Sequence, residues 1–298
     1  MAAGTASTLD LSSLPAPDLI ELQSFDTILA RMVGDVQARL PSFDATVDSD
    51  PAVTVLQVAA YYVQLQCAAI NDLARQQMVA FATGANLDHL AALVRVRRLE
   101  VDAGDAARGV APTLESDAAL RQRIVLAPEG FSVAGPQLAY VYHAKSADGA
   151  VRDASATSPA PGEVLVSVLA RDGDGTAPAD LLARVAEVVN SDSVRPLGDL
   201  VTVASAEILP FQVEARLVTF TGPDIDLVLA AARRSLDAYL AASRLLGRDI
   251  TRSGLYAALH VAGVMRVELT SPAADIVCDD TQATHCIAIA LAHGGYDA

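Results

Sequence analysis

Residues 48–84 carry the sequence DSDPAVTVLQVAAYYVQLQCAAINDLARQQMVAFATG, the stretch around which the rest of the chain is organised. Neither proline nor glycine interrupts it between Pro51 and Gly84. Pro51 suits the first position of a helix, where its missing N–H needs no partner, and Ser49 or Asp50 can cap the free amides. Gly84 suits the left-handed position that closes a helix. The stretch therefore predicts one helix of roughly thirty residues, a rod of about 45 Å.

Apolar residues recur along this stretch at spacings of three and four. They are Val53, Leu56, Ala60, Val63, Cys67, Ile70 and Ala74. This spacing places them on one stripe of a helix. The other faces carry tyrosine, glutamine and asparagine, so the helix is predicted to be neither membrane-like nor strongly charged. A rod this long is expected to pack on more than its own small domain.

The composition indicates a chain that buries sizeable cores with few aromatic side chains. Of its 298 residues, 52 % are hydrophobic and 4 % aromatic, and Trp is absent, so cores of Ala, Val and Leu are expected. The length suggests about two domains. The net charge of −15 opposes binding to nucleic acid or to an anionic membrane, because both need a positive footprint. The longest apolar run, residues 286–292, is far below the roughly 18 residues of a membrane span, so we expect a soluble chain.

The N-terminal third is predicted to be helical. Residues 1–23 are rich in Ala, Ser and Pro and form an extended arm, either a mobile tail or an arm on a neighbouring subunit. Residues 24–94 form a helical domain, which contains a first amphipathic helix, the long helix and a short third helix. Residues 95–111 are expected to be a linker to the next domain.

The remaining chain predicts two small α/β units, in residues 112–206 and 207–298. The first opens with a helix from Pro112 and continues in β-β-α-β order, and the second follows β-α-α-β-β order. Strands are expected at 151–157, 163–170, 200–206, 211–217, 264–269 and 286–292. The predicted fold class is α+β: a helical N-terminal domain followed by two small α/β units with mixed or antiparallel sheets.

Motifs for catalysis or cofactor binding are incomplete throughout the sequence. A Walker-type phosphate loop needs Gly-Lys, but the single lysine, Lys145, follows Ala144. The five histidines lack the i, i+4 pairing of a helical zinc site. We therefore expect no enzyme activity, no cofactor and no metal.

Two groups of residues support an alternative hypothesis, a soluble metal-binding enzyme or module. Cys278, His285 and Cys286 lie close in sequence, but a fourth ligand is not evident. Residues 172–175, in which Asp172 and Asp174 alternate with glycines, lack the third oxygen ligand of a calcium loop, so an acidic turn is favoured. Three cysteines are typical of a reduced cytosolic chain, although a pair between Cys278 and Cys286 stays open.

Several short motifs, taken in order, resemble the baseplate J-like family of contractile phage tails and related injection devices. They are Asp50-Pro51, Ala60-Tyr61, Ile70-Asn71-Asp72, Gly84, Leu87-Asp88, Glu115, Asp117, Arg121, Arg123, Gly135, Tyr140 to Ser146 with His143, and Arg195-Pro196. The resemblance extends from Leu11 to the C-terminal residues Tyr296, Asp297 and Ala298, and its order and spacing make chance agreement improbable. It marks these residues as family-motif and assembly candidates.

The resemblance implies a structural role in the tail baseplate of a virion assembled in the host cytoplasm. A member of this family is expected to be a wedge subunit whose copies associate into a ring around the central hub. It is expected to contact other wedge proteins, the sheath-initiating protein, hub proteins and tail-fibre-bearing proteins. We expect the N-terminal helices to bind other wedge chains and the C-terminal units to contact other copies.

Overall fold

The computed structural model describes residues 11–47, 50–132, 134–222 and 224–296. The predictions for residues 1–10, Asp48, Ser49, Asp297 and Ala298 lie outside this part of the chain. Two compact units are present: residues up to 97 together with 116–125, and residues 98–115 together with 126–298. The division into five segments made from the sequence stays a prediction.

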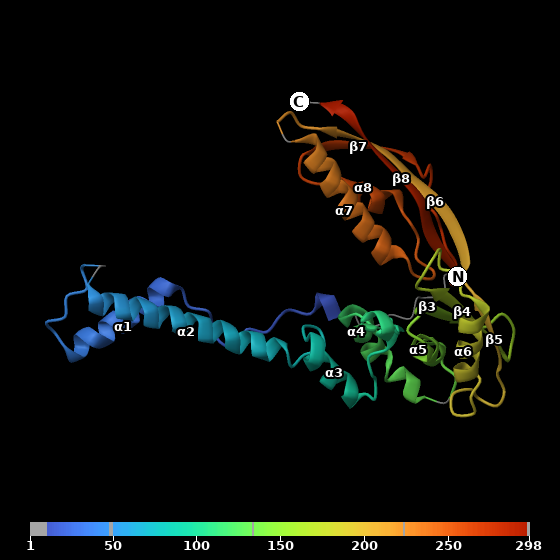
Figure 1. Ribbon diagram of the computed structural model, residues 1–298, viewed down its shortest axis with the longest axis horizontal. Helices are drawn as coiled ribbons and strands as arrows, with labels where there is room; N and C mark the ends of the chain where they lie inside the picture. Colours follow the sequence, from blue (N-terminus) through green and yellow to red (C-terminus); the bar gives the residue numbers. More distant parts are fainter. Residues whose placement is uncertain (1–10, 48–49, 133, 223, 297–298) are drawn as a thin grey trace. The chain divides into compact units, whose positions relative to one another are not determined.

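The first unit is helical. It contains the 3-10 helix η1 (Leu11–Ser13) and helices α1 (Phe25–Arg39), α2 (Pro51–Arg75), α3 (Gly84–Leu93) and α4 (Asp117–Leu126). Helix α1 lies against α2 (Figure 1). As predicted, Pro51 is the first residue of α2, and Asp50 Oδ1 accepts a hydrogen bond of 2.8 Å from a first-turn amide. Within the predicted stripe Val53 and Ala60 are buried, whereas Ile70 is exposed.

Helix α2 ends at Arg75, so the prediction that it continues to Gly84 is wrong. Its 25 residues make a rod of about 37 Å. In the turn that follows, Gln76 Oε1 accepts hydrogen bonds from Thr83 N at 3.0 Å and Asn86 Nδ2 at 3.2 Å. These hydrogen bonds to the Gln76 side chain hold the turn. Gly84 then starts α3 with φ +53°, a conformation that favours glycine, instead of closing α2.

The second unit begins with a small two-stranded sheet and continues into an α/β layer. Its elements are β1 (Glu100–Asp102), η2 (Ala106–Arg108), β2 (Thr113–Leu114), η3 (Glu129–Phe131), α5 (Gln137–Ala147), β3 (Val151–Thr157), β4 (Glu163–Ala170), α6 (Ala179–Val189) and β5 (Leu200–Ser205). The sheet order is β3-β4-β5, with β3 antiparallel and β5 parallel to β4. Val166 and Val168 of β4 belong to the same core as Leu181 and Val185 of α6.

The helix predicted to open at Pro112 begins at Asp117 instead. Residues 113–114 form β2, which pairs antiparallel with β1. The buried Glu115 explains the difference. Its backbone N–H donates to Leu99 O at 2.8 Å, and its carboxylate Oε2 accepts from Leu99 N at 3.2 Å. Because these bonds hold the segment extended, part of the predicted linker belongs to a sheet.

The C-terminal layer follows with strands and helices in the predicted β-α-α-β-β order. Its elements are β6 (Glu207–Thr219), α7 (Ile225–Ser243), α8 (Arg252–Leu259), β7 (Val264–Ser271) and β8 (Gln282–Tyr296). The sheet order is β7-β6-β8, with β7 antiparallel and β8 parallel to β6. Helices α7 and α8 lie on one side of this sheet (Figure 1). Their core contains Val213 and Leu217 of β6 with Leu236 and Leu255 of the helices.

Strands β6 and β8 are longer than predicted because each supplies the other's hydrogen-bond partner from Glu207 and Gln282 onward. No alternating pattern marks those extra residues in the sequence. Both three-stranded sheets combine one antiparallel and one parallel neighbour. The predicted α+β class with mixed sheets is confirmed.

Strand β3 joins the two layers of the second unit. Arg152 Nε donates to the backbone O of Arg244, just past the end of α7, at 2.8 Å. Asp153 Oδ2 accepts from Leu246 N at 3.1 Å, and its other carboxylate oxygen forms an ion pair of 3.1 Å with Lys145. The single lysine of the chain is thereby part of the interior of this unit.

Candidate assembly surfaces

The N-terminal arm is held along α2 by Asn71, a motif residue that is only 1 % exposed. Asn71 Oδ1 accepts from Ile20 N at 3.0 Å, and its Nδ2 donates to Ile20 O at 2.8 Å. Arg75 of α2 also forms an ion pair of 2.9 Å with Asp18. The sequence left open a mobile tail or an arm on a neighbouring subunit. Residues 18–23 of the arm contact the long helix of their own chain.

A second set of motif residues fixes the turn after α2. Arg121 of α4 donates from Nε to Val79 O at 2.7 Å and from Nη2 to Ala82 O at 2.8 Å. Asp117 Oδ2 accepts from Gly84 N, the first amide of α3, at 3.1 Å. Helix α4, which follows some forty residues later, therefore determines where α2 stops and α3 starts.

A third set surrounds the loop before β5. Tyr140 is buried in α5, and its hydroxyl donates to Asp199 Oδ2 at 2.7 Å. Burial, followed by this hydrogen bond and the negative charge of Asp199, raises the pKa of Tyr140, which therefore remains a donor. Arg195 Nη1 donates to Asp199 O at 2.9 Å. Gly135 has φ +75°, and a Cβ there would lie 2.7 Å from Pro196 Cγ.

The other motif residues are divided between interior and surface. Leu87 is fully buried in α3, whereas Asp88 beside it is exposed. Asp72 forms a surface ion pair of 3.2 Å with Arg75. Arg123 is buried and donates to Arg97 O at 3.1 Å.

His143 occupies a partly buried site in α5, where burial lowers its pKa, opposed in part by a hydrogen bond with the backbone of Gly130. Like most of the motif residues, it makes its contacts inside a unit. Whether these residues take part in assembly stays a prediction.

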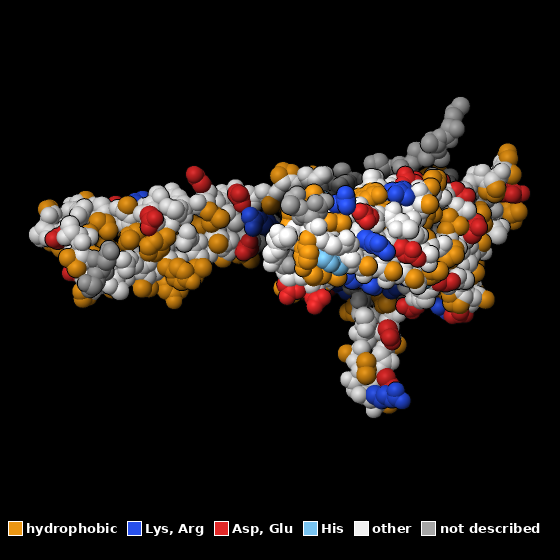
Figure 2. Space-filling view, turned by 90° about the horizontal axis from the view of Figure 1, so that it is seen from above, with side chains coloured by type: hydrophobic (Ala, Val, Ile, Leu, Met, Phe, Trp, Pro, Cys, Tyr) orange, Lys and Arg blue, Asp and Glu red, His pale blue; other side chains and the backbone are white. Residues whose placement is uncertain are grey.

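The most exposed apolar feature of the first unit is a second stripe on α2, here called the α2 outer stripe. It comprises Val55, Val58, Tyr62, Leu65, Ala69 and Leu73, again at spacings of three and four. Val55 is 66 %, Tyr62 60 % and Leu73 65 % exposed. Figure 2 shows patches of hydrophobic side chains along this part of the molecule. The stripe predicted from the sequence lies on another face of α2, although the spacing from Val55 onward was a usable signal.

Few charges interrupt the outer surface of α2. Asp72 and Arg75 are the charged residues of the helix, both in its last turn. By length and composition alone, α2 is apolar enough to cross a membrane. Just 11 % of the 18-residue apolar segment that meets this criterion is buried within the chain. A helix with so much uncovered apolar surface is expected to have a partner.

The residues of the alternative metal hypothesis are not brought together. The backbone N–H of Cys278 donates to Asp249 Oδ1 at 2.8 Å, and Cys286 Sγ donates to Ala288 O at 3.3 Å within β8. Burial raises the pKa of both thiols, and all three cysteines are free. Within the described ranges, no group of three or more His, Cys, Asp or Glu side chains is arranged to hold a metal ion.

The acidic stretch 172–175 forms a turn between β4 and α6. Asp174 Oδ1 accepts from Thr176 N at 2.8 Å, which lowers the pKa of the carboxyl group. Gly173 and Gly175 both have positive φ, and Gly173 O accepts from Arg244 Nη2 at 2.7 Å. These contacts are those of a turn joined to the C-terminal layer.

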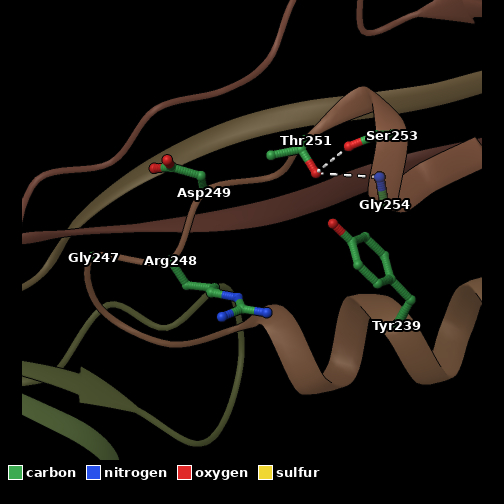
Figure 3. Close-up of a pocket in the computed structure, with 7 residues that line it drawn as sticks. All are labelled: Tyr239, Gly247, Arg248, Asp249, Thr251, Ser253 and Gly254. Atoms are coloured by element: carbon green, nitrogen blue, oxygen red, sulfur yellow. Dashed lines mark hydrogen bonds between the residues drawn. The ribbon is translucent and has the colours of Figure 1, made fainter. Parts of the chain in front are cut away.

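A polar hollow of about 540 Å³ lies between α7 and the start of α8 (Figure 3). Its lining residues are Tyr239, Gly247, Arg248, Asp249, Thr251, Ser253 and Gly254. Thr251 Oγ1 accepts from Gly254 N at 3.1 Å, and Asp249 Oδ1 accepts from Cys278 N at 2.8 Å. These groups serve the cap of α8 and a neighbouring loop.

Comparison with known proteins shows the family to which the chain belongs. Three family models match in order: the baseplate J-like N-terminal domain at residues 48–105, the baseplate J-like central domain at 132–205 and the baseplate J-like protein C-terminal domain at 211–292. The chain belongs to the baseplate J-like family, and it is a structural component of the phage tail baseplate.

Among individual relatives, the chain is similar to baseplate protein J of Escherichia phage P2. The two are 43 % identical over 299 residues, which cover 97 % of this chain and 99 % of the relative. A chain of the cryo-EM structure of the anti-feeding prophage baseplate, six-fold symmetrised, matches with 17 % identity and a TM-score of 0.41. That match covers 59 % of this chain and 43 % of the other, so this chain spans less than half of its length.

Proposed function

We propose that this protein is a wedge subunit of a contractile-tail baseplate whose copies associate into a ring around the central hub. Each copy would anchor the sheath-initiating protein and peripheral, fibre-bearing proteins, and it would have no catalytic role. In this proposal the α2 outer stripe binds helices of other wedge chains. The α/β layers of the second unit contact neighbouring copies.

The observation that carries the proposal is the α2 outer stripe. Spacings of three and four are those of a coiled-coil seam, in which side chains of one helix fill the gaps of another. Burying one exposed Val or Leu side chain contributes about 1.5–3 kcal/mol. A seam with several such residues is therefore sufficient to hold a partner helix, and α1 leaves it uncovered.

A membrane is the competing partner for an apolar helix of this length. A membrane-spanning helix is apolar all round, whereas the other faces of α2 carry polar groups that bind the arm. Asn71 and Arg75 hold residues 18–20, and Gln64 Nε2 donates to Gln23 O at 3.4 Å. Insertion would break these contacts, so we favour helical protein partners.

The proposal is tested by placing a charge in the stripe. The gene is disrupted in its parent genome and complemented with wild type, Leu65→Glu or the control Leu197→Glu. Leu197 is the matched control because it is a fully exposed leucine in the second unit. We expect sheathed tails by electron microscopy with wild type and Leu197→Glu, and bare tubes or unattached heads with Leu65→Glu.

Two measurements separate assembly from folding and from membrane binding. Circular dichroism of purified Leu65→Glu should match wild type, because an exposed position costs the isolated chain little. Flotation with anionic and neutral vesicles should leave the wild-type chain at the bottom of the gradient. Normal numbers of sheathed tails with Leu65→Glu would overturn the role of the stripe. Intact tails after complete gene disruption would overturn the baseplate function itself.

A further inference from the structure

Among the described residues, strand β8 has a long edge of the C-terminal sheet without a neighbouring strand. In the order β7-β6-β8 it is paired with β6 alone. Beyond Gln282, the backbone of β8 forms hydrogen bonds with no described segment other than β6. From Ala288 to His293 its pairing with β6 is uninterrupted, after a bulge at Ile287. This β8 edge segment, residues 288–293, spans about 20 Å.

The two edges of this sheet differ in their protection against pairing. The opposite edge, β7, carries Arg266 and Glu268, which form an ion pair of 3.0 Å on the exposed side. Charged side chains are a usual means by which natural sheets keep an edge from pairing. The β8 edge segment reads Ala-Ile-Ala-Leu-Ala-His and contains no proline, lysine or acidic residue. Its edge is thus open to a further strand.

The side chains of the segment leave room for such a strand. Ile289 and Leu291 pack on the core beneath the sheet. Ala288, Ala290 and Ala292 alternate with them and are exposed on the other face. Alanine methyl groups present little bulk above the sheet, so a neighbouring strand is able to lie flush with β8. Hydrogen bonds of its backbone would satisfy the free N–H and C=O groups of the edge.

We propose that the β8 edge segment pairs in antiparallel orientation with the same segment of a second copy of this chain, across a two-fold axis near Ala290 or Leu291. The proposal rests on the proposed self-association of copies and identifies the surface that carries it. The pairing would join two three-stranded sheets into one continuous sheet. It is an isologous contact, in which each copy offers the same patch.

A second copy fits this edge because the alternation of small and larger residues in the β8 edge segment is similar when the segment is read in reverse. With the axis at Leu291, Ala290 faces Ala292 of the other copy, and Ile289 faces His293. With the axis at Ala290, Ala288 faces Ala292. In both registers small residues meet small residues on the exposed face, and core-facing side chains meet one another on the other face.

Charge also favours this surface for contact between copies. Two chains of formal net charge −15 repel each other over most of their surfaces. The β8 edge segment has no acidic residue, so two copies approach there without placing carboxylates opposite each other. A partner with a basic strand would gain nothing from this neutral edge.

Cysteine cross-linking in assembled particles tests the pairing. The three native cysteines are replaced by alanine, and Ala290→Cys or the control Thr270→Cys is added. Thr270 is an exposed residue on the other edge strand, β7, where the pairing with β6 shifts register between Leu269 and Ser271. Particles from complemented lysates are treated with an oxidant or a short bis-maleimide and analysed by immunoblot. We expect a dimer band from Ala290→Cys at least ten times stronger than that from Thr270→Cys.

A charge at the edge gives a second, independent measurement. Ala290→Lys should weaken self-association of the purified chain at least ten-fold by sedimentation velocity, and Thr270→Lys should leave it unchanged. Equal cross-linking at both edges, or none at Ala290, would overturn the β8 pairing while the chain is still present in the particles. Absence of the chain from purified particles would instead overturn the proposed function, and the β8 pairing with it.

Discussion

Replacing Asn71 by alanine is expected to release the N-terminal arm from α2 without unfolding the helix. The side chain is buried and makes both of its hydrogen bonds to the backbone of Ile20, at 2.8 and 3.0 Å. Each intramolecular hydrogen bond contributes about 0.5–1.5 kcal/mol net, so the pair contributes about 2 kcal/mol to arm docking. Once released, the Ile20 groups bond to water. The loss is therefore limited to the free energy that holds the arm.

Hydrogen exchange measured by mass spectrometry is the assay that isolates this effect. About 2 kcal/mol corresponds to roughly a 30-fold faster exchange of the Ile20 amide, since each 1.4 kcal/mol is a factor of ten. Peptides within α2 should keep their wild-type protection. Gln66→Ala, at an exposed polar position of the same helix, serves as the matched control and should change neither region.

Two results would refute this reasoning. If the Ile20 amide exchanges at the wild-type rate in Asn71→Ala, the arm is held by contacts other than this pair of hydrogen bonds. If protection is lost throughout α2, Asn71 supports the helix itself, and the arm is not an independent element. The surface ion pair between Asp18 and Arg75 offers a comparison, because Asp18→Ala should cost less than about 1 kcal/mol.

Three further predictions concern the second unit. Tyr140→Phe removes the hydroxyl that donates to Asp199 and should lower the free energy of unfolding by about 1–3 kcal/mol in urea titrations. An unchanged midpoint of urea unfolding would show that the hydroxyl contributes nothing to stability. Gly135→Ala places a Cβ at a residue with positive φ and against Pro196, so it should lower the free energy of unfolding by about 1–3 kcal/mol. Wild-type stability of this variant would contradict the strain inferred at Gly135. Burial lowers the pKa of His143 in the folded state, so the unfolded chain takes up the proton first and stability falls as the pH drops below about 6.5. His143→Gln should remove that part of the pH dependence in thermal scans at pH 5 and pH 8, and an equal pH dependence in both proteins would rule His143 out as its source.

The sequence predicted best where the signal is local. Asp50 and Pro51 marked the start of α2 because a cap and a proline act within one turn. The periodic apolar residues identified the helices and most strands of the second unit, since one face of each element is buried. The order of motifs placed the chain in its family, because the order and spacing of many short motifs carry information that a single position does not.

The sequence failed where the partner of a residue is distant. The end of α2 depends on Arg121 of α4, which takes the carbonyl groups of Val79 and Ala82. The extended segment before α4 depends on Glu115 and its bonds to Leu99. Nothing in the local sequence signals these contacts, because side-chain to backbone bonds have no periodicity.

Local chemistry in the sequence thus determined the class of fold, the start of the long helix and the absence of a recognisable catalytic motif. Tertiary structure alone decided which surfaces are left for other molecules. The outer face of α2 is open because α1 and the arm lie against other parts of the helix. The edge of β8 is open because, among the described strands, β6 alone pairs with it. Exposure is a property of what packs nearby, and a single linear pattern does not contain it.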